Sequence, residues 1–202
     1  MHDYRTGTYS TFLVQCILAN VTSHVSSELL SEAGYSDRFA AQRTFFSKAQ
    51  LLYDMGTEKS QLHLLQGSLL LSALHFSFGL DKDYRFWLIN AVRLATQMGL
   101  HRKQVAKQLD GPTAKLFRRI WWVLYNRDVL LVVSGVSNVR GLNDRHCDVA
   151  VLTDDDWEEE IDMDDARDLL PAITRLHKVY LVQNTKLALI CRCCRRIQQA
   201  CD

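Results

Sequence analysis

The chain has 202 residues, 48% of them apolar and 23% charged, an ordinary composition for a globular protein with room for one large domain and not for two. Its formal net charge of +1 gives no argument about a nucleic-acid partner. No apolar run approaches the roughly 18 residues of a membrane span, and the polar start, followed by a run that Gln15 interrupts, shows no secretory signal. We therefore expect a soluble intracellular protein whose six cysteines are reduced thiols.

Segments with helical periodicity follow one another along the chain and are separated mostly by glycines. Pro112 and Pro171 each stand where a helix is expected to begin, a position at which the missing N–H group costs nothing. The predicted helices span residues 11–32, 37–55, 60–78, 84–98, 112–134 and 171 towards the C-terminus. No stretch alternates strictly, so we predict an all-α protein of about six helices, packed as antiparallel helical hairpins, with no sheet. A weak repeat of residues 51–56 at 94–99, each copy ending on Met-Gly, supports the hairpins.

The predicted helix at 112–134 is apolar on more than one side and is expected to be central. Its stripe at three-and-four spacing consists of Leu116, Phe117, Ile120, Trp121, Leu124, Tyr125, Leu131 and Val132. Trp122 and Val129 lie off this stripe, whereas Asp128 interrupts it. A buried carboxylate needs a cation or donors, and Arg127 cannot serve because adjacent helical residues do not face each other. We therefore predict that Asp128 forms a structural ion pair with a cation from another segment.

Two blocks of sequence, Arg-Arg-Ile-Trp-Trp-Val-Leu-Tyr-Asn-Arg-Asp at 118–128 and Asp-Arg-His-Cys-Asp-Val at 144–149, stand at the end of this region. They resemble the signature of the fungal-specific transcription factor domain, the regulatory middle homology region of the fungal binuclear zinc cluster transcription factors. Residues 64–72 and 87–102 resemble two further blocks of that family in the same order, so the resemblance covers roughly residues 40 to 155. Two departures are Val136-Ser137, where the family usually has Arg-Pro, and Ala150, where it usually has Pro.

The resemblance implies a regulatory core at 37–153, preceded by an N-terminal helical segment at 1–36 and followed by an acidic loop at 154–170 and a basic, cysteine-containing helix at 171–202. The signature residues, which we interpret as architectural, are Arg118, Arg119, Trp121, Trp122, Asp128, Cys147 and Asp148. The domain would modulate transcription by RNA polymerase II in the nucleus through intramolecular, dimer or effector contacts. The alternative is a stand-alone helical interaction or ligand-binding module from a truncated gene, without DNA binding.

The resemblance also implies partners. DNA would be contacted through a zinc cluster absent from this chain, so zinc is implied for that cluster and we expect no cofactor here. A homodimer, a small-molecule effector and a coactivator are the other partners, and no membrane is expected.

No enzyme motif is present in the sequence. We find no phosphate loop, nucleophile elbow, His-Glu-x-x-His or dinucleotide fingerprint, so we predict that the chain is not an enzyme. The seven histidines lack the spacing that places two metal ligands on one helix face. Cys147 beside His146 could form a nucleophile pair, but adjacent residues rarely face each other. His101 follows a helix end, where we expect an imidazolium to meet the helix dipole.

Residues 154–168 hold ten acidic residues against Arg167 alone, which leaves a surplus of ten positive charges on the rest of the chain. Trp157, Ile161 and Met163 are interleaved with these acids, a pattern also found in disordered activation segments. We favour a solvated loop that faces the basic surface of its own domain.

Cys191, Cys194 and Cys201 have the Cys-x2-Cys-x6-Cys spacing of the first half of the family's zinc cluster. Two zinc ions sharing six thiolates need three further cysteines, and the family places its cluster before the middle region. We therefore favour a basic terminal helix whose cysteines act as small apolar residues, with half of a zinc cluster as the open alternative.

Overall fold

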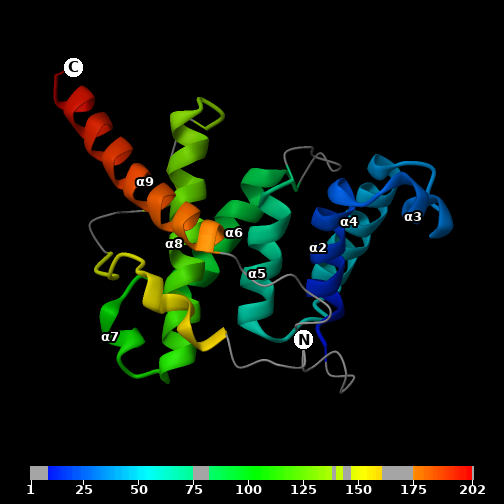
Figure 1. Ribbon diagram of the computed structural model, residues 1–202, viewed down its shortest axis with the longest axis horizontal. Helices are drawn as coiled ribbons and strands as arrows, with labels where there is room; N and C mark the ends of the chain where they lie inside the picture. The colour runs from blue at the N-terminus through cyan, green and yellow to red at the C-terminus, as the bar shows by residue number, and fades with distance from the viewer. Residues whose placement is uncertain (1–8, 75–81, 138–139, 143–146, 161–174, 202) are drawn as a thin grey trace. The chain divides into compact units, whose positions relative to one another are not determined.

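The computed structural model describes residues 9–74, 82–137, 140–142, 147–160 and 175–201, with 158–160 and 192–201 described by their backbone alone. These residues form α2 (Thr11–Val21), η1 (Thr22–His24), α3 (Ser27–Glu32), α4 (Arg38–Asp54), α5 (Gln61–Ser72), α6 (Tyr84–Gln97), α7 (Lys103–Ala106), α8 (Gly111–Val133), η3 (Asp154–Glu160) and α9 (Arg175–Cys201) (Figure 1). No strand occurs among them, and the all-α prediction is confirmed. Within the same ranges no helix is both long enough and apolar enough to span a membrane.

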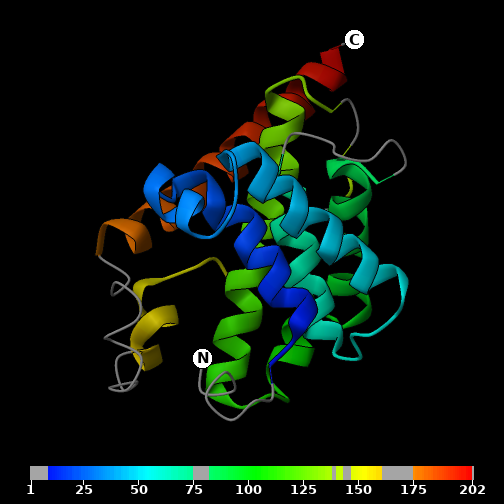
Figure 2. The same cartoon turned by 90° about the vertical axis from the view of Figure 1, so that its right-hand side faces the viewer.

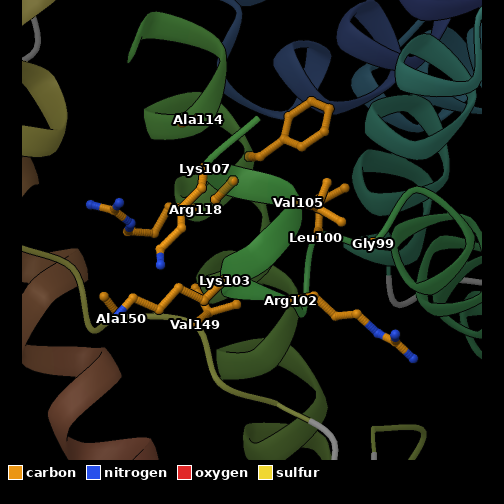
Figure 3. Close-up of a pocket in the computed structure, with 12 residues that line it drawn as sticks. Gly99, Leu100, Arg102, Lys103, Val105, Lys107, Ala114, Arg118, Val149 and Ala150 are labelled. Carbon is orange, nitrogen blue, oxygen red and sulfur yellow. The ribbon is translucent and has the colours of Figure 1, made fainter. Parts of the chain in front are cut away.

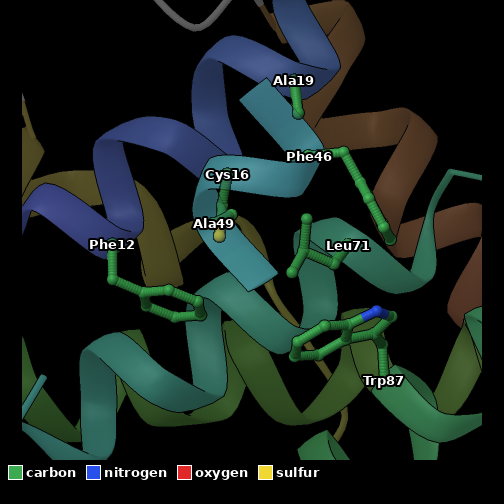
Figure 4. Close-up of a cluster of buried hydrophobic side chains, with 7 residues drawn as sticks. All are labelled: Phe12, Cys16, Ala19, Phe46, Ala49, Leu71 and Trp87. Carbon is green, nitrogen blue, oxygen red and sulfur yellow. The ribbon is translucent and has the colours of Figure 1, made fainter. Parts of the chain in front are cut away.

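The chain divides into two compact units, Met1–Leu94 and Ala95–Asp202, and the division falls within α6. In the first unit α2 packs against both α4 and α5. The core between them consists of Phe12, Cys16, Ala19, Phe46, Ala49, Leu71 and Trp87 (Figure 4). The Trp87 ring packs edge-on against Tyr53 and Phe86, with ring centroids 5.0 Å apart in each pair. Burial raises the pKa of the Cys16 thiol, so this cysteine is a neutral apolar side chain, as expected of a reduced core cysteine.

The predicted boundaries hold at several helices and fail at two. The helix predicted at 60–78 ends at Ser72, and residues 75–78 lie outside the described residues. Asp37 and Ser60 act as N-caps, which accounts for the starts of α4 and α5 close to the predicted positions. The predicted helix at 11–32 instead breaks after residue 21. There, Thr22 and Ser23 donate their hydroxyl groups to backbone carbonyls, and Ser26 caps the new helix α3. The short helix α7 was not predicted, because four residues are too few to show helical periodicity.

In the second unit α8 packs against α9 (Figures 1 and 2). Thr185 of α9 is fully buried and accepts a hydrogen bond from Asn126 Nδ2 at 3.1 Å, while Val182 and Ala188 are also buried. In both views the two helices run in the same general direction, so this pair is not an antiparallel hairpin. The 41 residues between the two helices are enough for the chain to turn back before α9 begins.

Gly67 brings α5 into close contact with α2 inside the first unit. A Cβ atom at this position would lie 2.2 Å from Phe12 Cε1 and 3.1 Å from Cys16 Sγ. Phe12 is itself buried in the core, so its ring has little room to move aside. This explains why glycine occurs within a helix, where it lowers stability relative to alanine.

We expect Gly67→Ala to destabilise the protein by about 1–2 kcal/mol. A Cβ atom 2.2 Å from a buried ring should cost about 2–3 kcal/mol, the upper part of the range for overpacking, and about 1 kcal/mol is regained in helix propensity. Urea denaturation measures the change. Adding Phe12→Leu should recover part of the loss, since the two side chains share one contact. A Gly67→Ala variant as stable as the wild type would show that the helices are not packed this closely.

Glu58 connects the starts of α2 and α5. Its carboxylate accepts hydrogen bonds from the Ser10 hydroxyl and from the Ser60 N–H group at 2.7 Å, and these two serines are the N-caps of the helices. His63 Nδ1 lies 3.4 Å from the same carboxylate. Burial acts to raise the pKa of Glu58, but the hydrogen bonds and the charge of His63 outweigh it, so the pKa lies below its usual 4.5.

Because the pKa of Glu58 is lower in the folded than in the unfolded chain, its ionised form stabilises the fold above about pH 4.5, and this stabilisation is lost as pH falls through the folded pKa. Urea titrations from about pH 7 to about pH 3 should therefore show a steeper acid loss of stability for the wild type than for Glu58→Gln. The exposed Glu32→Gln provides the control and should follow the wild-type profile. Parallel profiles for wild type and Glu58→Gln would contradict this assignment.

Candidate functional site

The sequence signature described above lies largely on α8. The helix starts at an Asp110 N-cap, whose carboxylate accepts the Thr113 N–H at 3.1 Å, with proline in the first turn. Three of the predicted signature residues, Trp121, Trp122 and Asp128, are at most 3% exposed. Their burial agrees with the expected central position of this helix, and it leaves polar atoms on α8 that other segments must satisfy.

Asp128 is the most heavily bonded of these groups. Its carboxylate accepts hydrogen bonds from Arg140 Nε at 3.0 Å, from the Gly141 N–H at 2.7 Å and from the Leu142 N–H at 3.3 Å. The Arg140 guanidinium also lies over the Tyr125 ring, 4.9 Å from its centroid. The prediction that the partner cation comes from another segment is confirmed. The contact fixes residues 140–142 onto the buried face of α8.

A second polar contact joins α8 to the acidic segment. Asp156 is 1% exposed, and its carboxylate accepts from Arg118 Nη1 at 2.6 Å and from the Thr153 N–H at 2.9 Å. Arg119 Nη1 donates to the Asp156 carbonyl oxygen at 2.7 Å. The neighbouring Trp157 is also buried. Residues 154–160 thus form the short helix η3, in which Asp154 and Asp155 are exposed whereas Asp156 and Trp157 are buried, so the expectation of a solvated loop does not hold at these two residues. The expected contact with basic residues of the same domain occurs. Residues 161–170 lie outside the described ranges.

Residues 147–150 are held from two sides. Trp122 Nε1 donates to the Ala150 carbonyl oxygen at 2.8 Å. The exposed Asp148 accepts from the Lys103 N–H at 2.7 Å, and its own N–H donates to the His101 carbonyl oxygen at 3.2 Å. Hydrogen bonds thus join this segment to the start of α7 through Asp148 and to α8 through Trp122.

His101 is buried beside Trp121, with ring centroids 5.9 Å apart. Its Nε2 accepts a hydrogen bond from Arg102 Nε at 3.0 Å, so this nitrogen carries no proton. The structural role expected for His101 is supported, but the expected imidazolium is not. Cys147 is half-buried, and its candidate partner His146 lies outside the described residues.

The cysteine spacing of the C-terminal tail does not fit a shared zinc ion. Residues 175–201 form one continuous helix, α9. At a rise of about 1.5 Å per residue, Cys191 and Cys201 are separated by about 15 Å along the axis, whereas Zn–S bonds are about 2.3 Å long. The side chains of 192–201 lie outside the described part of the chain. Among the residues that are described, no three His, Cys, Asp or Glu side chains gather as metal ligands.

Comparison with known proteins identifies the family. The model of the family described as the fungal specific transcription factor domain matches residues 2–193. The chain belongs to this family. It is 37% identical over 190 residues to the fusaric acid cluster transcription factor FUB12 of Gibberella moniliformis, covering 94% of the chain and 28% of that protein.

Other relatives also carry names of transcription regulators. The chain is 33% identical over 189 residues to the cutinase transcription factor 1 beta of Fusarium vanettenii, covering 94% of the chain and 21% of that protein. It is 31% identical over 126 residues to the acetamidase regulatory protein of Aspergillus fumigatus, covering 60% of the chain and 16% of that protein. The chain thus spans less than a third of the length of these relatives. No solved structure matches it.

We expect Asp128→Asn to destabilise the protein by about 3 kcal/mol, because breaking a buried ion pair leaves Arg140 without its charged partner and turns an amide N–H₂ towards backbone donors. Thermal and urea denaturation of the fungal transcription factor domain measure this loss. The exposed Asp155→Asn removes the same charge from the same unit and should leave stability within about 0.5 kcal/mol of wild type. Equal stability of the two variants would show that Asp128 does not anchor residues 140–142.

Proposed function

We propose that this chain is the regulatory domain of a longer fungal transcription factor, which acts in the nucleus and modulates transcription by RNA polymerase II. The observation that carries the proposal is the family match over residues 2–193, together with relatives that are named transcription factors and are more than three times as long as the matched region. A domain of this kind would act on the DNA-binding and activating parts of the longer protein. The chain itself would bind and restrain those parts and would not act as a catalyst.

The contacts on α8 support a regulatory role of this kind. Three segments that follow α8 in the sequence, residues 140–142, 147–150 and 154–157, are each held to it by hydrogen bonds to buried or half-buried side chains. Such segments can occupy a second position when their few polar contacts are broken, and regulation needs two such states. We therefore assign the signature residues Arg118, Arg119, Trp122 and Asp128 an architectural role, in which they hold these segments in one state. Trp121 contributes to the core beneath them.

The partners follow from the same proposal. DNA would be bound by a zinc cluster elsewhere in the longer protein, and zinc would belong to that cluster. Intramolecular contacts, a second copy of the protein, a coactivator or a small-molecule effector would change the state of the domain.

We expect the domain to change the output of an activator to which it is linked. The chain is inserted between a heterologous DNA-binding domain and an activation domain, and reporter transcription is compared with that of the same fusion carrying a flexible linker of equal length. Output should change by at least about fivefold, the lower range of allosteric coupling. Asp128→Asn should reduce this effect, because it releases residues 140–142, whereas Asp155→Asn should keep it.

Immunoblots must show equal amounts of all fusions, so that a loss of stability is not read as a loss of regulation. Reporter output identical to that of the linker fusion would contradict the proposal and favour a stand-alone interaction module.

A further inference from the structure

A pocket of about 150 Å³ lies within the second unit, between α7, the first turns of α8 and the segment at 149–150 (Figure 3). Its apolar wall is formed by Leu100, Val105, Ala106, Ala114, Phe117, Val149 and Ala150. This volume accommodates a single six-membered ring or a short aliphatic chain. The pocket is therefore suited to a small molecule, and its wall favours one with an apolar body.

Among the described residues, the polar side chains that line the pocket are all cationic. They are Arg102, Lys103, Lys107 and Arg118. The side chains of Lys103, Lys107 and Arg118 extend to one side of the pocket, whereas Arg102 points to the other (Figure 3). Arg118 already has Asp156 as its partner. Arg102 donates to His101 Nε2 and points to the other side, so on the side of Arg118 the remaining positive charge comes from the two lysines.

Lys103 and Lys107 are four residues apart, so they lie on the same face of the α7 turn, where like charges repel. Within the described part of the chain, no carboxylate lies within ion-pairing distance of either ammonium group. A bound anion would relieve this repulsion and would form charge-assisted hydrogen bonds. The apolar wall and the two lysines together select a ligand with one negative end and one apolar end.

The pocket walls are positioned before any ligand binds. Gly99, at φ +75°, turns the chain from α6 towards α7, and a Cβ atom there would lie 2.8 Å from Val105 Cγ2. On the other side, Trp122 and the Lys103 N–H hold residues 148–150. Binding of a ligand therefore costs little free energy for ordering the site.

We propose that this pocket binds a small organic monoanion, a carboxylic acid whose apolar body is a single ring or a short chain. The effect of this binding on regulation rests on the proposed function. A ligand that touches α7 and Val149–Ala150 would stabilise the same segment that Trp122 and Asp148 hold, and would favour that state of the domain.

The test is an NMR titration of the ¹⁵N-labelled chain with benzoate, its uncharged analogue benzamide, and inorganic phosphate. Benzoate should shift the amide signals of residues 99–107 and 149–150 in a saturable manner. Benzamide should bind about tenfold more weakly, since it lacks the charge-assisted hydrogen bonds. Phosphate, which has no apolar body, should also bind about tenfold more weakly at these amides.

Two variants and a control locate the site. The double variant Lys103→Gln, Lys107→Gln should weaken benzoate binding by about tenfold or more, and Ala114→Leu should abolish it by filling the pocket. Lys186→Gln removes an exposed positive charge from α9 and should bind benzoate like the wild type. If circular dichroism shows that Ala114→Leu is not folded, the double lysine variant alone tests the location of the site.

The proposal is overturned if benzoate causes no saturable shift at these amides, or if benzamide or phosphate binds equally well. It is also overturned if a peptide with the sequence of residues 154–168 binds there more tightly than benzoate, because the pocket would then hold a protein segment. The NMR titration measures ligand binding without transcription, and the reporter fusion measures regulation without added ligand. Each proposal can therefore fail while the other stands.

Discussion

Polar side chains on a largely buried helix must find their partners within the protein, and this constraint organises the second unit. Asp128, Trp122 and Arg118 project from α8, and each is satisfied by a segment that lies further along the chain. A buried carboxylate left without its cation is strongly unfavourable, so the contact with Asp128 stabilises residues 140–142 in this position. The irregular segments of this unit are thus positioned by the polar groups of one helix.

The first unit is organised differently. Its core is apolar and aromatic, and the close approach of α2 and α5 depends on the absence of a side chain at Gly67. Polar groups act at its edge, where Glu58 binds the two serines that cap α2 and α5. Apolar packing therefore brings these helices together, while the carboxylate fixes their starting points. The second unit instead uses hydrogen bonds to place segments that have little regular structure of their own.

This contrast bears on regulation in the fungal transcription factor family. A close-packed helical core has one well-defined arrangement. Within the described part of the chain, residues 147–150 are held by a few hydrogen bonds and by no ion pair, so they can change position at a lower cost in free energy than the ion-paired residues 140–142. Residues 147–150 also form one wall of the cationic pocket, through Val149 and Ala150. A ligand in that pocket and the polar contacts of α8 would consequently act on the same part of the chain, which is the requirement for coupling between them.

The sequence by itself determined the all-α class, most helix boundaries and the central position of α8, because these follow from periodicity, capping residues and glycine positions that are local in the chain. It also identified Asp128 as a buried carboxylate in need of a cation. It did not identify Arg140, Asp156 or the Ala150 carbonyl as partners, since no local pattern connects residues 12, 38 or 28 positions apart. Adjacent Arg118 and Arg119 on an apolar helix, and Trp157 among acids, were the available signals for the docked acidic segment. Only the tertiary structure decided which residues meet, because burial and pairing depend on how the whole unit packs and not on the spacing within one helix.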